Sequence, residues 1–197
     1  MLHVTGDSSA ALVLRLMREL GPDRAWGARR ARFEHGDGVA GDLVSLARRL
    51  GVVVVQNPSH FDPSPPGTPA TAGPDGATPG LLRSLLAAGV PVALGSDGPP
   101  NPFLNVMLAA AHAANPREAI TREQAVAAYT RGSAFAEFAE RDKGTLAPGM
   151  LADLAVLSQD VFPVPARALP GTTSVLTLVG GRAAFDAGVL APPAARP

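Results

Sequence analysis

Cysteine is absent from this sequence, which excludes disulfide bonds and metal sites built on thiolates. Any bound metal would therefore be held by histidine, aspartate or glutamate. No apolar run approaches the ~18 residues of a membrane span. The first seven residues also lack the basic and apolar regions of a signal peptide. These absences make the cytoplasm the expected location.

Net charge of either sign is missing as well, because 17 Lys and Arg residues balance 17 Asp and Glu residues. Without a basic block there is no electrostatic reason to expect nucleic acid or an anionic membrane as a partner. Apolar residues are abundant, at 46% of the 197 positions, which is enough for a sizeable core. The 21 glycines and 20 prolines indicate many turns between short elements.

Short apolar runs alternate with segments of helical spacing along the first 114 residues. Such alternation predicts βαβ units and a parallel sheet, so the expected class is α/β. Residues 61–80 are rich in Pro and Gly and predict a long flexible loop. In chain order, strands are expected at 2–5, 31–35, 52–55 and 90–95, and helices at 10–20, 39–50, 81–88 and 103–114.

The remainder of the chain predicts two helices followed by a small β element. A capping box at residues 121–124 begins a helix that reaches residue 129, and a second helix covers 133–140. Strands are expected at 151–157, 175–179 and 182–185, with Gly180 and Gly181 forming a two-residue hairpin turn. This pattern divides the chain into a first domain at 1–140, a β domain at 141–190 and a disordered tail at 191–197.

Residues that can bind a metal lie where the expected strands end. His3, His35 and Asp97 each end or follow a strand, and His60 follows another. The carboxyl ends of neighbouring parallel strands lie together, so these side chains would converge. Two histidines and an aspartate are ordinary zinc ligands, with water in the fourth position. The ion would lower the pKa of that water, and Asp97 could accept its proton.

Structural interpretations of the same residues stay open. Asp97 precedes Gly98 and Pro99, so it could simply cap a turn. A single histidine near a strand end is more often hydrogen-bonded than metal-bound. His112 lies within an expected helix and is interpreted as structural. Glu34 precedes His35, so strand alternation points it to the opposite face, where it would pack or support a ligand.

Seven segments resemble, in order, the metal-dependent amidohydrolase superfamily. The resemblance is strongest to the amidohydrolase-3 group, which includes YtcJ-like and N-substituted formamide deformylase-like proteins. Seven motifs in the right order are far more specific than any one of them. They cover residues 2–7, 32–35, 56–60, 89–97, 121–130, 143–154 and 179–182.

The resemblance implies the second half, strands 5–8, of a (β/α)8 TIM barrel together with the C-terminal part of a small β-sandwich. It implies that His3, His35 and Asp97 are the metal ligands, that Asp97 is also the general base, and that His60 faces the substrate. The implied cofactor is a divalent metal, zinc first, although iron, nickel and manganese suit the same ligands. The implied reaction is hydrolysis of a non-peptide C–N bond, in an amide, formamide or cyclic amide, by metal-activated water.

Two expected family features are missing from the sequence. The His-x-His pair that the family carries on strand 1 is absent. The family also usually has a carboxylated Lys on strand 4, whereas the only lysine here, Lys143, lies in the C-terminal turn. We therefore expect a C-terminal fragment that is inactive or weakly active without an N-terminal half. Its open strand edges would favour a homo-oligomer or a separate partner half. The alternatives are a non-catalytic subunit that docks on a partner carrying the missing strands, or a decayed reading frame without function.

Overall fold

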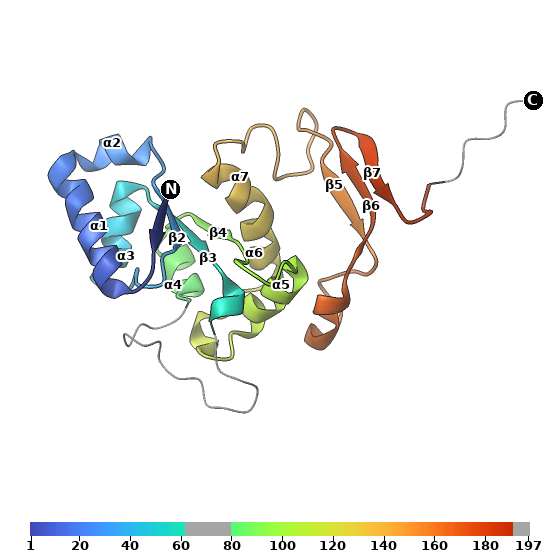
Figure 1. Ribbon diagram of the computed structural model, residues 1–197, viewed down its shortest axis with the longest axis horizontal. Coiled ribbons are helices and arrows are strands. Elements are labelled where there is room, and N and C mark those ends of the chain that lie inside the picture. The colour runs from blue at the N-terminus through green and yellow to red at the C-terminus, as the bar shows by residue number, and fades with distance from the viewer. Residues whose placement is uncertain (62–79, 191–197) are drawn as a thin grey trace, which may run out of the picture.

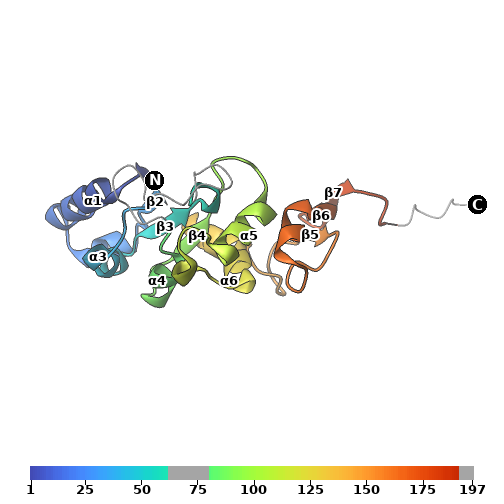
Figure 2. The ribbon, with the colours of Figure 1, turned by 90° about the horizontal axis from the view of Figure 1, so that it is seen from below.

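The computed structural model describes residues 1–61 and 80–190, and its elements form two sheets. The larger sheet is parallel, with the order β1 (Leu2–Val4), β2 (Arg32–His35), β3 (Val53–Gln56) and β4 (Val92–Leu94). The smaller sheet is antiparallel and contains β5 (Leu154–Leu157), β6 (Ser174–Val179) and β7 (Arg182–Asp186). It lies at the end of the molecule far from the N-terminal helices (Figures 1 and 2).

Helices connect the parallel strands and continue beyond them. The α-helices are α1 (Asp7–Leu20), α2 (Asp23–Gly27), α3 (Asp42–Leu50), α4 (Leu82–Ala87), α5 (Pro102–Ala111), α6 (Arg122–Ala127) and α7 (Ser133–Ala136). A π-helical segment, η3 (Ala128–Gly132), joins α6 to α7. Short 3-10 helices are η1 (Pro58–His60), η2 (Pro116–Glu118) and η4 (Ala166–Gly171).

The alternation of strands and helices expected from the sequence is confirmed, and the large sheet is parallel throughout. The capping box is confirmed, because Thr121 and Gln124 exchange side-chain and backbone hydrogen bonds. Gly180 and Gly181 form the hairpin turn, with φ values of 56° and 75° that match a primed turn. The expected loop at 61–80 and the tail at 191–197 fall almost entirely outside the described residues.

The helices differ from the expectation in three respects. Helix α2 was not anticipated, because five residues are too few to show a helical period after the Gly21-Pro22 stop. The helix expected at 133–140 ends at Ala136, and Phe138 adopts a left-handed φ of 64° beyond it. The helices on either side of Gly132 form one continuous helical stretch rather than two separate ones.

Apolar side chains cover one face of the parallel sheet along all four strands and the opposite face at β3 and β4. On the helix side, Val4, Phe33 and Val54 pack in one buried cluster with Leu14 of α1 and Leu50 of α3. β-Branched residues favour such doubly covered strands. On the opposite face, Val53, Val55 and Ala93 pack against Ala136, with Phe135 beside them. Helix α7 therefore shields this face of the sheet at β3 and β4.

The two edges of the parallel sheet differ. At β1, Leu2 is 44% exposed, so this edge is open as expected. At β4 every residue is buried, because η3 packs against the strand. A Cβ on Gly132 would lie only 2.4 Å from the Val92 carbonyl oxygen, so this close approach requires glycine. Pairing with another chain is therefore more accessible at β1 than at β4.

The segment between β5 and β6 returns to the larger part of the molecule. Val161 and Leu169 are buried in the main hydrophobic cluster, and η4 packs on α5. The Arg122 guanidinium donates hydrogen bonds to the carbonyls of Val161 and Val164, at 3.0 and 2.6 Å. The division of the chain at residue 140 stays a prediction, and this segment links its two sides.

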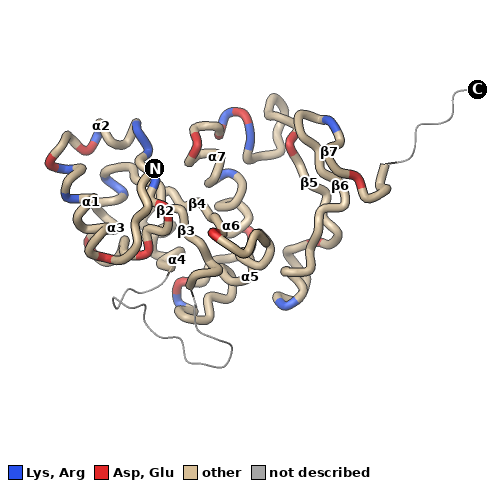
Figure 3. Tube along the Cα trace, in the orientation of Figure 1, with Lys and Arg blue, Asp and Glu red and all other residues tan. Residues whose placement is uncertain are grey.

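Charged residues of both signs are interspersed along the chain (Figure 3). Within the described ranges, no helix is both long enough and apolar enough to cross a lipid bilayer. An ion pair joins the two ends of the larger part of the molecule: the Arg30 guanidinium lies over the rings of Phe135 and Phe138 and pairs with Glu140. This pair fastens the chain after α7 to the loop before β2.

We expect acid to weaken this connection. The hydrogen bonds from Arg30 lower the pKa of Glu140 from 4.5 to about 2. A carboxylate with a depressed folded-state pKa stabilises the fold above its unfolded pKa, and this stabilisation is lost as the pH falls from 4.5 toward 2. Glu140→Gln should lower the urea midpoint at pH 7 and flatten its pH dependence, while the exposed Glu19→Gln should do neither. If the urea midpoints of the wild type and of Glu140→Gln changed with pH in parallel, this role would be contradicted.

Candidate metal site

The residues at the ends of β2 and β4 leave strand geometry abruptly. His35 has a φ of 69°, and Asp97, three residues beyond β4, has a φ of 46°. Non-glycine residues are uncommon in this left-handed region, and such strain gathers at functional sites. At His35 the positive φ bends the chain out of the alternation that would place its ring on the same face as Phe33. Both side chains consequently lie beyond the carboxyl end of the sheet.

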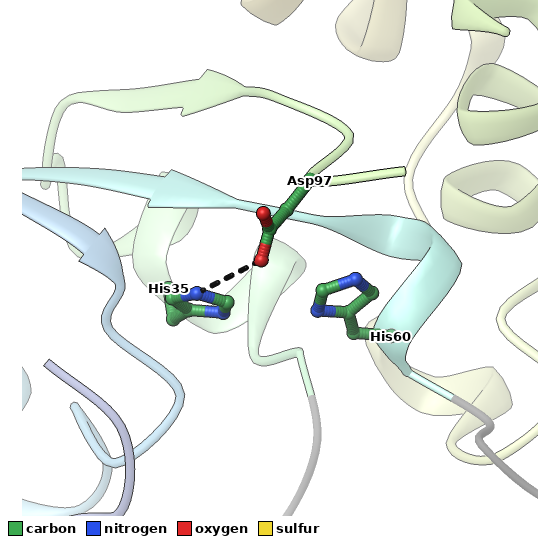
Figure 4. Close-up of side chains that lie close together, drawn as sticks. All are labelled: His35, His60 and Asp97. Carbon is green, nitrogen blue, oxygen red and sulfur yellow. Dashed lines mark ion pairs between the residues drawn. The ribbon is translucent and has the colours of Figure 1, made fainter. Parts of the chain in front are cut away.

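Three side chains from separate strand ends meet there. The donor atoms of His35, His60 and Asp97 all lie within 4.8 Å of one another. His35 Nε2 is 3.4 Å from Asp97 Oδ2, and the rings of His35 and His60 are roughly parallel, with centroids 5.5 Å apart. In Figure 4 the Asp97 carboxylate points toward His35 while His60 approaches from the other side. His35 is buried, whereas His60 and Asp97 are open to solvent.

His3 lies next to this group. Its ring packs edge-on against the His35 ring, with centroids 4.5 Å apart. The convergent triplet contains His60 rather than His3. The ligand set predicted from the sequence, His3 with His35 and Asp97, and the substrate role predicted for His60 both remain predictions. The structure brings all four residues into one neighbourhood.

The donor set suits a divalent cation. Zinc binds imidazole nitrogen and carboxylate oxygen at about 2.0–2.2 Å, which places neighbouring tetrahedral ligand atoms ~3.4 Å apart. The 3.4 Å between His35 Nε2 and Asp97 Oδ2 already matches this spacing. The triplet's largest separation stays within 4.8 Å, so side-chain rotation of the exposed His60 and Asp97 can close it. The three residues fit a metal ion with room for water or substrate.

Asp37 belongs to the same neighbourhood and was missed by sequence reasoning. Its Oδ2 lies 3.9 Å from His35 Nδ1, the ring nitrogen that faces away from Asp97. Burial raises the pKa of Asp37, while His35, His60 and His3 oppose this rise. A carboxylate beside the second nitrogen of a ligating histidine fixes its tautomer and orientation. The Gly36-Asp37-Gly38 sequence looked like an ordinary turn, although the spacing of two from His35 was a usable signal.

The backbone of His35 is also held by a residue at the end of β3. Gln56 Nε2 donates to the His35 carbonyl at 2.7 Å, and the Asn57 amide lies beside the His35 ring. Gly95 leaves room for the Asn57 amide, because a Cβ there would lie 2.7 Å from Asn57 Oδ1. The Tyr129 hydroxyl of η3 donates to the carbonyl of Gly95, the first residue after β4, at 2.7 Å. Burial raises the pKa of Tyr129 to about 12, so the hydroxyl keeps its proton at neutral pH.

Two other residues singled out in the sequence lie outside the metal-site triplet. His112 ends α5 in a left-handed conformation instead of lying within the helix, and it is buried. Its Nε2 lies 2.6 Å from the Gly80 carbonyl oxygen and its ring stacks on Phe61, which fits the structural role expected for it. Glu34 pairs with Arg32 and not with a metal-site residue.

A parallel α/β sheet with imidazoles and a carboxylate beyond the carboxyl ends of its strands is the arrangement of metal-dependent hydrolases. The amidohydrolase family matches residues 1–185, and the chain belongs to that family. The family predicted from the seven motifs is thereby confirmed.

Two curated relatives extend this finding. The chain is 29% identical over 194 residues to Protein LONG AFTER FAR-RED 3 of Arabidopsis thaliana, covering 92% of this chain and 33% of the relative. It is 25% identical over 198 residues to the putative amidohydrolase YtcJ of Bacillus subtilis, covering 94% and 37% respectively. The chain thus spans about a third of the length of these relatives.

Solved structures show the same fold. An amidohydrolase from Thermotoga maritima matches with a TM-score of 0.67 and 20% identity, over 93% of this chain and 42% of the other. An adenosine deaminase from Xanthomonas campestris with bound zinc matches with a TM-score of 0.63 and 21% identity, over 88% and 40%. At these identities the likeness concerns the fold alone.

Proposed function

We propose that this chain carries a divalent metal site of an amidohydrolase that hydrolyses non-peptide C–N bonds in small amide-type molecules. The observation that carries the proposal is the convergence of His35, His60 and Asp97 within 4.8 Å on a fold of this family. In this assignment His35 and Asp97 are ligands, as the sequence predicted. His60 is the third ligand, and His3 is the competing candidate for that position.

Zinc is the metal that best suits two imidazoles and a carboxylate, with iron, nickel and manganese as alternatives. A bound divalent cation would supply Lewis-acid chemistry and lower the pKa of water. Asp97, whose side chain is 59% exposed, would accept a proton from the attacking water and return it to the leaving nitrogen. Asp37 would hold the His35 ring in position through Nδ1.

The substrate class draws support from the family. One relative is described as a putative amidohydrolase. The family match makes an amide, a formamide or a cyclic amide the first substrates to test.

We further propose that full activity needs strands beyond these four, with the chain acting as the C-terminal half of a (β/α)8 barrel and its sandwich. The support is the open edge at β1 and the share of the relatives that the chain spans. A separate N-terminal half or a second copy would supply those strands. A non-catalytic docking subunit is the alternative, favoured by exposed apolar side chains on the small sheet, where Phe185 is 51% exposed.

The test begins with the purified chain and zinc. Metal analysis should find one ion per chain, and turnover of simple formamides and cyclic amides should be weak. Adding a separately expressed N-terminal half from a relative should raise turnover. Failure to bind zinc would refute the metal-site proposal, and turnover by the chain alone equal to that of a full-length relative would refute the need for further strands.

A further inference from the structure

The metal-site triplet joins side chains from two different loops. His60 lies at the end of η1, after β3, whereas Asp97 lies in the loop after β4. Their side chains are exposed, so packing alone does not fix the distance between them. A direct connection between the two loops would hold the donors ready for an ion.

Ser59, the neighbour of His60, makes that connection. Its Oγ lies 2.8 Å from the Ser96 carbonyl oxygen and 3.1 Å from the Gly98 carbonyl oxygen. These are the carbonyls on either side of Asp97, and the single hydroxyl proton is shared between them. The loop that carries Asp97 is thus hydrogen-bonded to the residue next to His60.

Ser59 is itself anchored to the helical layer. Its backbone N–H donates to Asn105 Oδ1 at 2.8 Å, and Asn105 is completely buried on α5. The Asn105 side-chain amide in turn donates to the Asn101 carbonyl at 3.2 Å. The backbone of Ser59 is therefore fixed by α5, while its hydroxyl contacts the loop after β4.

We infer that Ser59 is a positioning residue that sets the spacing between His60 and Asp97 for metal binding. The inference rests on the proposed function. Asp97 has a left-handed φ of 46°, a conformation that needs support from its surroundings. Without the hydroxyl, the carbonyls of Ser96 and Gly98 lose this partner, and the Asp97 loop gains freedom relative to His60. Groups that orient metal ligands from outside the ligand set typically change metal affinity by about 10–100-fold.

Calorimetric titration with zinc tests this inference. Ser59→Ala should weaken zinc binding ~10-fold, the lower end of the range for such groups, while Ser59→Thr, which keeps the hydroxyl, should restore most of the affinity. The urea midpoint of the metal-free protein should stay close to that of the wild type, although zinc binding is weaker. The matched control is Ser158→Ala, which removes a hydroxyl that accepts a hydrogen bond from the Thr173 N–H next to the smaller sheet.

A second readout does not depend on metal. Amide hydrogen exchange in the metal-free chain should be faster at residues 95–98 in Ser59→Ala than in the wild type or in Ser158→Ala. If the wild type fails to bind zinc, the proposed function falls, while faster exchange would still support the link between the two loops. Two results would overturn the role of the hydroxyl. One is amide exchange at residues 95–98 that is no faster in Ser59→Ala than in the wild type, and the other is an equal loss of zinc affinity in Ser59→Ala and Ser59→Thr.

Discussion

His35→Ala is expected to weaken zinc binding by more than ~100-fold, beyond the 10–100-fold typical of residues that only support ligands. His35 is the only imidazole shared by the two candidate ligand sets, and it is 7% exposed. Its Nε2 faces Asp97 and its Nδ1 faces Asp37, so its removal takes away the imidazole at the centre of the group. Calorimetric titration of the purified chain with zinc measures the effect.

His35 is buried, so its removal could also disturb the fold. His35→Asn, which keeps a polar side chain of smaller size, should give the same loss of binding with less disturbance. Circular dichroism and the urea midpoint of both variants, compared with Ser158→Ala, separate binding from folding. Zinc affinity within threefold of the wild type in a folded variant would contradict a ligand role for His35.

The second large effect separates His60 from His3. His60→Ala should weaken zinc binding by more than ~100-fold, as a lost ligand does, whereas His3→Ala should weaken it by ~10-fold or less, as a supporting neighbour does. The reason is geometric: the convergent triplet contains His60, while His3 packs edge-on against the His35 ring. Both residues are exposed, so neither substitution should alter the urea midpoint strongly.

The opposite ranking would support the ligand set that the sequence resemblance implies. A large loss of zinc affinity with His3→Ala and a small loss with His60→Ala would make His3 the ligand and leave His60 with the substrate role. Equal large losses would indicate that both imidazoles bind the ion. A cobalt-substituted sample distinguishes these cases further, because its visible absorption changes when a nitrogen ligand is lost.

The strands and their parallel order could be predicted because β-branched runs alternate with helical spacing. The run at Val52–Val55 is a buried central strand, as its composition indicated. His35 and Asp97 could be singled out because His35 ends β2 and Asp97 lies in the turn that follows β4. Parallel strands place their carboxyl ends together, so convergence followed from topology alone.

The choice between His3 and His60 depends on features that residue types do not show. The positive φ of His35 redirects its ring, and no glycine signals this conformation in the sequence. The 3-10 helix η1 brings His60 back toward Asp97, and the Ser59 N–H within it donates to Asn105, 46 residues further along the chain. Asp37 was overlooked because glycines on both sides mark a turn, whatever the aspartate itself contacts.

The cover over β4 could not be foreseen for a related reason. The sequence predicted open strand edges, but η3 packs against β4 at Gly132, and α7 packs on β3 and β4 through Phe135 and Ala136. Small residues in a helix are compatible with many partners, so their spacing does not say which sheet they approach. The contact between Gly132 and Val92 joins segments that are distant in the sequence, so only the folded structure shows it.

The most direct test is the anomalous scattering of a crystal of this chain equilibrated with zinc. A single peak about 2.0–2.2 Å from ring nitrogens of His35 and His60 and a carboxylate oxygen of Asp97 is the expected result. A peak at another group of residues, or no peak at zinc concentrations that saturate relatives of this family, would contradict the central claim that these three side chains form a metal site.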